Sequence, residues 1–180
     1  MFPKASWPIA ERIEARSLIL EPLRVEDAAE VAAALDDPEL HLFIGGQPAT
    51  ADELRTRFEL LVVGESPDGS QGWLNWVLRD KDSADVVGTV QATLIRRDEG
   101  DLAEVAWTVG TPWQGQGRGK DAAGALVTWL WGQGVDVLVA HIHPEHSASN
   151  SVARSIGLSP TEQFVDGERR WERARVTPLT

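Results

Sequence analysis

The stretch that decides the fold of this chain reads Val109-Gly110-Thr111-Pro112-Trp113-Gln114-Gly115-Gln116-Gly117-Arg118-Gly119-Lys120-Asp121. It begins at the end of a predicted strand, and apolar residues at helical spacing follow it. Glycines at 115, 117 and 119 let backbone N–H groups approach an anion without interference from Cβ atoms. The helix beyond contributes unpaired N–H groups and a partial positive charge, and Arg118 and Lys120 add cationic side chains. These features predict a turn that binds a pyrophosphate.

The spacing of the glycines argues against the two common nucleotide-binding loops. A dinucleotide fingerprint needs G-x-G-x-x-G, whereas this turn reads G-x-G-x-G and follows a series of predicted antiparallel strands. A Walker loop needs serine or threonine after Gly-Lys, whereas Asp121 follows Gly119-Lys120. The remaining alternative is a glycine-rich connection that binds no ligand.

The pattern outside the turn predicts a mixed α/β (α+β) domain. Strands are expected at residues 17–21, 73–78, 86–95, 102–109, 135–142, 162–165 and 169–176. Helices are expected at residues 25–35, from the capping box Thr50-Ala51-Asp52-Glu53 toward Gly64, at 121–131 and at 147–156. Short charged turns between the strands of residues 73–109 favour antiparallel pairing, and the apolar run 135–142 predicts a strand covered on both faces. Residues 1–15 are expected to form an N-terminal arm, irregular over its first dozen residues, and residues 16–176 a single domain.

Composition limits the classes of function. The 180 residues include 28 acidic and 17 basic side chains, a net charge of −11, which argues against nucleic-acid binding. The same charge either attracts a cationic partner such as an amine or only keeps the protein soluble. The absence of cysteine excludes disulfides, thiolate metal ligands and a cysteine nucleophile. No apolar run is long enough for a membrane span or a signal peptide, so we expect no membrane partner and a cytoplasmic location.

Several motifs resemble those of the GNAT superfamily of N-acetyltransferases. Residues 114–119 match its signature Q/R-x-x-G-x-G/A, and residues 103–109 are similar to its fourth strand. Residues 143–149 with Ile156-Gly157-Leu158 resemble its N-x-x-S…G-F segment. The opening Leu18-Ile19-Leu20-Glu21-Pro22-Leu23 with Asp27-Ala28 resembles the ribosomal-protein-alanine acetyltransferase branch. The resemblance covers residues 16–176 and implies a mostly antiparallel central sheet with flanking helices, whose fourth and fifth strands splay to form an acyl-CoA cleft.

The resemblance also implies an activity, the transfer of an acetyl group from acetyl-CoA, as cosubstrate, to a primary amine by direct attack. The acceptor would be a protein N-terminal amine or a small-molecule amine, and the enzyme a monomer or homodimer. A catalytically silent acyl-CoA sensor or interaction module is the alternative. The chain contains no tyrosine, which many members use as an acid, and His146 stands where the family prefers asparagine.

The family's binding roles carry over to particular positions. The implied acyl-CoA-binding residues are Trp107, Thr108, Val109, Gln114, Gly115, Gln116, Gly117, Arg118, Gly119, Lys120, His146 and Arg154. Main-chain groups of residues 107–109 would pair with the pantetheine amides and polarise the thioester carbonyl. Residues 114–120 would hold the pyrophosphate.

Two residues are implied for proton transfer. Glu104 is the expected general base, with a solvated strand carboxylate as the alternative. Ser149 is the expected acid, with a helix-start serine that bonds backbone N–H groups as the alternative. Asn150 is expected to be a helix-surface residue. His141 and His143 lie on one strand face, but without cysteine or a clear third ligand we expect no metal.

Overall fold

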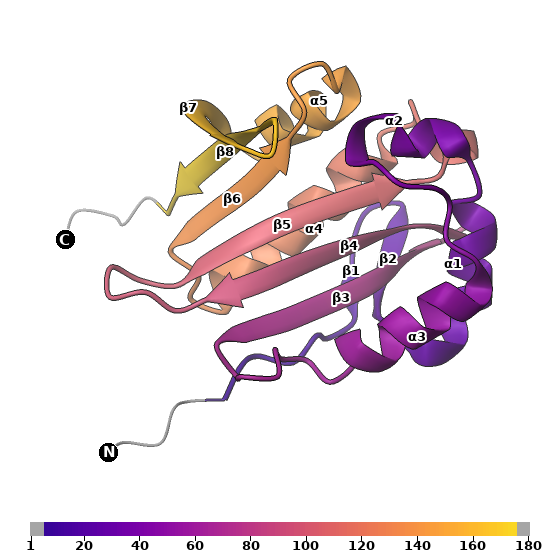
Figure 1. Cartoon of the computed structure of the whole chain (residues 1–180), viewed down its shortest axis with the longest axis horizontal. Coiled ribbons are helices and arrows are strands. Elements are labelled where there is room, and N and C mark those ends of the chain that lie inside the picture. Colours follow the sequence, from indigo (N-terminus) through magenta and orange to yellow (C-terminus); the bar gives the residue numbers. More distant parts are fainter. Residues whose placement is uncertain (1–5, 176–180) are drawn as a thin grey trace.

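In residues 6–175, which this computed structural model describes, eight strands form one sheet in the order β1-β2-β3-β4-β5-β6-β8-β7 (Figure 1). Their bounds are β1 (Ile13–Glu14), β2 (Leu18–Pro22), β3 (Gln71–Asp80), β4 (Val86–Ile95), β5 (Leu102–Val109), β6 (Val137–Ile142), β7 (Ser159–Val165) and β8 (Glu168–Ala174). The β5–β6 pair is parallel, and the other neighbouring strands pair antiparallel. The predicted mostly antiparallel α+β fold is therefore confirmed.

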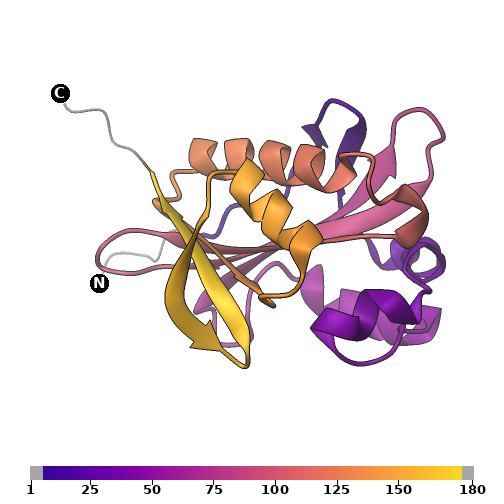
Figure 2. The same ribbon diagram turned by 90° about the horizontal axis from the view of Figure 1, so that it is seen from above.

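Helices cover both faces of the sheet (Figure 2). One face carries α1 (Ala28–Ala34), α2 (His41–Ile44) and α3 (Ala51–Leu61), and the other carries α4 (Arg118–Gly132) and α5 (Ser147–Ser155). The described part of the chain also contains the 3₁₀ turns η1 (Val25–Asp27), η2 (Pro38–Leu40) and η3 (Thr111–Trp113). The structure thus adds α2, η2 and η3 to the elements that periodicity predicts.

The main core lies between the sheet and α4. This helix buries Ala122, Ala123, Leu126, Val127 and Leu130, the residues that the helical spacing predicts to face inward. A smaller cluster joins α1 and α3 to the other face of the sheet, around Val31, Phe58 and Val77. Helices α1, α3 and α4 therefore each bury one apolar stripe, as expected of a helix packed on a sheet.

The start of α3 lies where the sequence predicts it, whereas the start of α4 lies three residues earlier. At the start of α3, Glu53 N donates to Thr50 Oγ1 at 3.3 Å and Thr50 N donates to Glu53 Oε2 at 2.8 Å, so the predicted capping box is confirmed. By contrast, α4 begins at Arg118 and not at Asp121, because Gly117 adopts a left-handed conformation and is itself the N-cap. The glycine turn therefore merges with the helix.

The described part of the predicted N-terminal arm ends in one short strand. Residues 1–5 of the arm and residue 176 of the predicted domain lie outside the described residues. Within the described part, Ile13 and Glu14 form β1 against Leu20 and Ile19, so the sheet extends into the arm. A strand of two residues is too short to produce an alternating pattern that the sequence could reveal. In residues 6–175, no helix combines the length and the apolar composition that crossing a bilayer requires.

Candidate functional site

The sheet opens between β5 and β6. These strands pair only through Leu102↔Val137, Ala103↔Leu138 and Glu104↔Val139, and then diverge (Figure 1). Beyond Glu104, β5 stays paired with β4 as far as Val109, whereas β6 stays paired with β8 as far as Ile142. Because each strand follows a different partner, the expected splay between the fourth and fifth long strands is confirmed.

The splay frees main-chain groups along the end of β5. Gly110 N donates to Val87 O of β4 at 2.8 Å, which fixes the side to which the peptide groups point. Main-chain groups alternate along an extended strand, so those of Val109 and Trp107 point away from β4 and toward the opening. Val109 O accepts from Gln114 Nε2 at 2.9 Å, in agreement with this direction. The N–H of Val109 therefore lies on the edge that faces the opening.

A cavity of about 340 Å³ adjoins this edge, between the end of β5 and the starts of α4 and α5. Its walls include every predicted acyl-CoA-binding residue except Gln116 and Arg154. Gln116 Nε2 donates to Pro112 O at 3.1 Å within the turn, and the Arg154 guanidinium lies 5.2 Å from the centre of the Trp171 ring. The structure thus brings residues 107–109, the glycine turn and His146 together.

The glycine turn presents unpaired backbone donors to this cavity. Gly115 and Gly117 have φ of +72° and +78°, a region that side chains with a Cβ disfavour. The N–H groups of residues 118–120 lie in the first turn of α4, so they have no intrahelical acceptor, and no side chain caps them. A Cβ at Gly119 would lie 3.2 Å from Val152 Cγ2, so this glycine allows α4 to approach α5 closely. The turn therefore leaves backbone donors and open space beside this cavity.

The charge of the turn differs from the expectation. The Arg118 guanidinium pairs with Asp80, which is 4% exposed and lies at the end of β3. A backbone hydrogen bond from Ser83, assisted by those from Asp82 and by Arg118, lowers the pKa of Asp80 although burial opposes the shift. The positive charge of Arg118 is therefore balanced by the Asp80 carboxylate. Lys120 is exposed and forms no ion pair within residues 6–175, so the positive potential comes from Lys120 and the helix end.

A second cavity of about 320 Å³ lies in the splay and contains Glu104, His141 and Glu168. Glu104 Oε1 lies 2.8 Å from His141 Nδ1. The pKa of Glu168 is raised by burial and by the charges of Glu104 and Asp166, against the opposing effect of His141 and His143. The two cavities share walls, namely Trp107, Thr108, His146 and Ser149. A group bound along β5 therefore adjoins the Glu104 carboxylate.

Ser149 lies where the two cavities meet. Within the described residues its Oγ makes no hydrogen bond, and α5 has His146 as N-cap without a side-chain bond. The alternative role as a helix-capping serine therefore receives no support from the structure. Its hydroxyl is available to a bound group.

His146 is held in place by an aromatic contact. The Phe43 ring of α2 stacks on it at a centroid distance of 4.6 Å and an interplanar angle of 20°, and also contacts His143. Burial, assisted by the nearby charge of His143, lowers the pKa of His146, so its imidazole is neutral at pH 7. The α2 segment was not expected, because four residues are too few for a periodic signal.

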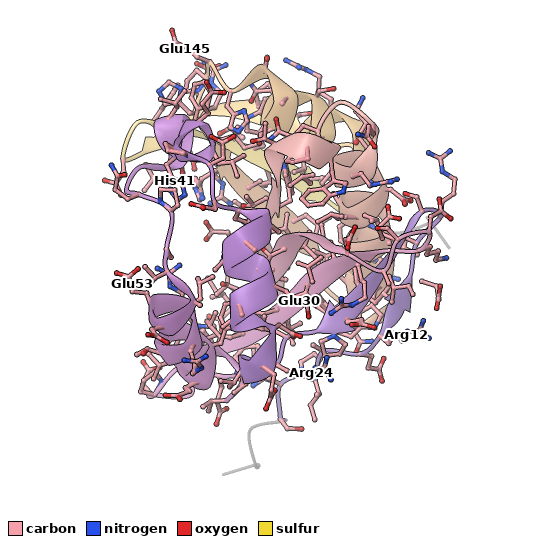
Figure 3. All side chains as sticks on the ribbon, turned by 90° about the vertical axis from the view of Figure 1, so that its right-hand side faces the viewer. Arg12, Arg24, Glu30, His41, Glu53 and Glu145 are labelled. Atoms are coloured by element: carbon pink, nitrogen blue, oxygen red, sulfur yellow. The ribbon has the colours of Figure 1, made fainter. Side chains whose placement is uncertain are left out.

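A third cavity of about 210 Å³ lies beneath α1 and α3, on the sheet face that also carries the Glu104 side chain and opposite to α4. Its lining residue His41 lies between Glu53, at the start of α3, and Glu145, of the loop before α5, in the view of Figure 3. Its floor carries Asn75 and Gln91, which are paired directly across β3 and β4. None of its lining residues is acidic, and Arg57 is its one arginine or lysine. Thr108 lines all three cavities, so the third cavity adjoins the other two at the end of β5.

Asn150 is not the helix-surface residue that was expected. It is 7% exposed, and its Nδ2 donates to Pro144 O at 2.9 Å, which ties α5 to the loop after β6. A helix-surface assignment failed because α5 packs against β6 and α4, which α5's own spacing does not reveal. Among residues 6–175, no three His, Asp or Glu side chains are arranged to hold a metal ion.

Comparison with known proteins gives one family. The model described as Acetyltransferase (GNAT) domain matches residues 17–159, most of the chain. No curated protein sequence matches. The match covers the sheet from β2 to β6, the glycine turn and α5.

Solved structures share the fold at low identity. The RimL ribosomal L7/L12 alpha-N-protein acetyltransferase in complex with coenzyme A has a TM-score of 0.75 at 16% identity, over 91% of this chain and 98% of that chain. The ribosomal-protein-S5-alanine acetyltransferase from Vibrio fischeri has a TM-score of 0.73 at 17% identity, over 91% and 96%. The microcin C7 self-immunity acetyltransferase MccE, in complex with acetyl-CoA and AMP, has a TM-score of 0.70 at 14% identity, over 88% and 93%.

Proposed function

The chain belongs to the GNAT family of acetyltransferases, and on that premise we propose that it transfers the acetyl group of acetyl-CoA to a primary amine. One observation carries the proposal: an uncapped helix start and a free strand edge line the same cavity, which adjoins a carboxylate. The first feature suits a pyrophosphate, the second suits amide groups, and the third suits proton removal from an amine.

The residues present fit coenzyme A. Positions of a Cβ at Gly115 and Gly117 have no atom within 4 Å, so the turn leaves open space beside its N–H groups. The N–H groups of residues 118–120 and the ammonium of Lys120 would hold the pyrophosphate. Main-chain groups of Trp107 and Val109 would bond to pantetheine amides, and Val109 N–H would stabilise negative charge on the thioester oxygen. Acetyl-CoA, when bound, supplies the thioester that the amine attacks.

Glu104 would take the proton that leaves the amine. An α-amine with a pKa of ~8 requires about 1.4 kcal/mol for deprotonation at pH 7, and a lysine with ~10.4 requires about 4.6 kcal/mol. A single carboxylate, acting directly or through water, is adequate for the first and demanding for the second. Ser149 would protonate the thiolate, but a thiol with a pKa of ~8.5 leaves readily, so its loss should reduce the rate only modestly.

The third cavity supports an acceptor with an uncharged or apolar body. Aliphatic side chains of α1 and α3 form its walls, and it lacks the carboxylates that a polyamine or aminoglycoside would require. The carboxamides of Asn75 and Gln91 offer donors and acceptors to peptide groups. These features favour a protein N-terminal amine over a polycationic small amine, although the molecule as a whole carries a net charge of −11.

The first experiment is a thermal-shift comparison of CoA, acetyl-CoA, ATP and NAD. A ligand present at ~100 times its Kd adds about 2.7 kcal/mol of stability. Stabilisation by the two CoA compounds and not by ATP or NAD is expected. Stabilisation by the nucleotides alone would reject the assignment.

The second experiment measures free thiol with a panel of N-terminal peptides, lysine peptides and polyamines. Release is expected with uncharged N-terminal peptides. Glu104→Gln should lower kcat/KM at neutral pH and less so at alkaline pH, where the free amine is abundant. Equal kinetics of the two proteins over that range would reject Glu104 as the base, and binding without release on any amine would favour a silent sensor.

A further inference from the structure

Glu104 and His141 form an isolated pair at the point where the sheet opens. Glu104 is the last residue of β5 that pairs with β6, and His141 lies two residues beyond its partner Val139 on the same face. The distance from Glu104 Oε1 to His141 Nδ1 is 2.8 Å, and both side chains line the cavity in the splay. The two residues are far apart in sequence, so their contact is a product of the sheet register.

The hydrogen bonds of this pair leave one atom unsatisfied. A carboxylate accepts only, so Nδ1 of His141 donates to Glu104 Oε1. His141 Nε2 is then an acceptor, and it is buried with no hydrogen-bond partner in the described residues. A buried polar atom without a partner costs about 1–3 kcal/mol, and an apolar β-branched residue at this strand position would avoid that cost. Stability alone therefore gives no reason for a histidine here.

The pair also leaves one oxygen open. The Glu104 side chain is 44% exposed, against 17% for His141. Within residues 6–175 the bond to His141 is the one hydrogen bond of the Glu104 carboxylate, so Oε2 makes none. His141 thus holds one oxygen and leaves the other directed to solvent or to a bound molecule.

Most of the other titratable side chains near the pair make contacts elsewhere and leave Glu104 to His141. On β8, Arg170 lies opposite His141 in the register and donates to Glu172 at 2.7 Å. His143 Nδ1 accepts from Glu145 N at 3.2 Å, and His146 stacks on Phe43. Glu168 lines the same cavity, and the charges of His141 and Glu104 act on its carboxyl in opposite directions. None of these groups bonds to Glu104 in the described residues.

We propose that His141 is the positioning residue of the general base: it fixes Glu104 Oε1 so that Oε2 meets the acceptor amine. This inference rests on the proposed acetyl transfer. The amine lone pair forms the N–C bond while the C–S bond breaks, and sulfur leaves with the electron pair. The amine proton passes to Glu104 Oε2, and the thiolate takes a proton from the Ser149 hydroxyl, which water then reprotonates. His141 exchanges no proton in this scheme and acts through the orientation of Glu104.

Two substitutions separate this role from packing. In His141→Asn the Nδ2 donor lies close to the position of Nδ1, so the bond to Glu104 is retained, whereas His141→Leu removes it. His141→Leu is expected to lower kcat about 10- to 100-fold, because a small misplacement of a catalytic group has this effect. KM for acetyl-CoA should stay within twofold, and His141→Asn should recover most of kcat. In a Glu104→Gln background, His141→Leu should have no further effect.

A readout that needs no turnover completes the test. In ¹⁵N-histidine NMR spectra, the wild-type protein should show a protonated Nδ1 for His141 and another for His41, whose Nδ1 donates to Gly45 O at 3.1 Å. Glu104→Gln should shift the His141 resonance and leave that of His41 unchanged. Wild-type kcat in His141→Leu, or an additive loss in the double variant, would overturn the proposal. Absence of thiol release by the wild-type enzyme would refute the acetyl transfer itself, and the NMR signal would then report whether the pair exists without it.

Discussion

Replacing Gly117 with valine tests the phosphate site without dismantling the fold. Gly117 has φ of +78° and ψ of 4°, and a Cβ there would meet no atom within 4 Å. The loss of stability therefore comes from backbone conformation alone, about 1–2 kcal/mol for a residue with a Cβ. For a domain of this size that lowers Tm by roughly 2–8 °C, and a typical stability of about 5–15 kcal/mol leaves the protein folded.

The effect on coenzyme A should be larger than the effect on stability. The valine side chain would fill the open space beside the N–H groups of residues 118–120, where the pyrophosphate is proposed to lie. Loss of one hydrogen bond to a charged group costs about 1.5–3 kcal/mol, which is roughly a 10- to 150-fold rise in Kd. Gly117→Ala, with less bulk, should lie between valine and wild type.

Isothermal titration with CoA at constant salt measures Kd, and a melting curve of the same sample measures Tm. Gly124→Ala is the matched control, because Gly124 lies within α4 and its Cβ position is also open. That control should bind CoA as the wild type does and gain about 0.5–1 kcal/mol of stability. A folded Gly117→Val protein with a Kd within twofold of the wild type would refute the assignment of the pyrophosphate to this turn.

Two further substitutions probe contacts around the site. Asp80→Ala should destabilise the protein by about 1–3 kcal/mol at pH 7, because it removes the partner of Arg118 and the acceptor of two backbone N–H groups. Hydrogen bonds lower the pKa of Asp80, so its contribution is complete above the unfolded pKa of ~3.9 and is lost as pH falls through the folded value. Urea titrations at pH 7 and pH 3 should show the gap between the two proteins narrowing in acid, and an unchanged gap would contradict the assignment. Phe43→Ala should raise Kd for CoA about two- to tenfold, since the ring contact with His146 is worth roughly 0.5–1.5 kcal/mol; unchanged affinity would show that α2 does not shape this cavity.

The features that the sequence determined by itself are local. The glycines of residues 114–119 specify a turn because positive φ is a property of one residue and its neighbours. The Thr50–Glu53 capping box specifies the start of α3 through bonds between residues three apart. The inward positions of α4 follow from helical spacing alone. The resemblance of these motifs to the GNAT superfamily predicted the fold and acetyl-CoA as the cosubstrate. The GNAT domain match bears out this family assignment.

Tertiary structure alone decided which side chains meet. The bond between Glu104 and His141 depends on the register of β5 and β6, and the ion pair of Arg118 with Asp80 depends on where β3 ends. Phe43 reaches His146 only because α2 lies beside the loop before α5. These contacts join residues that are distant in sequence. Their geometry is set by the pairing and packing of whole elements, which the spacing within any single element does not encode.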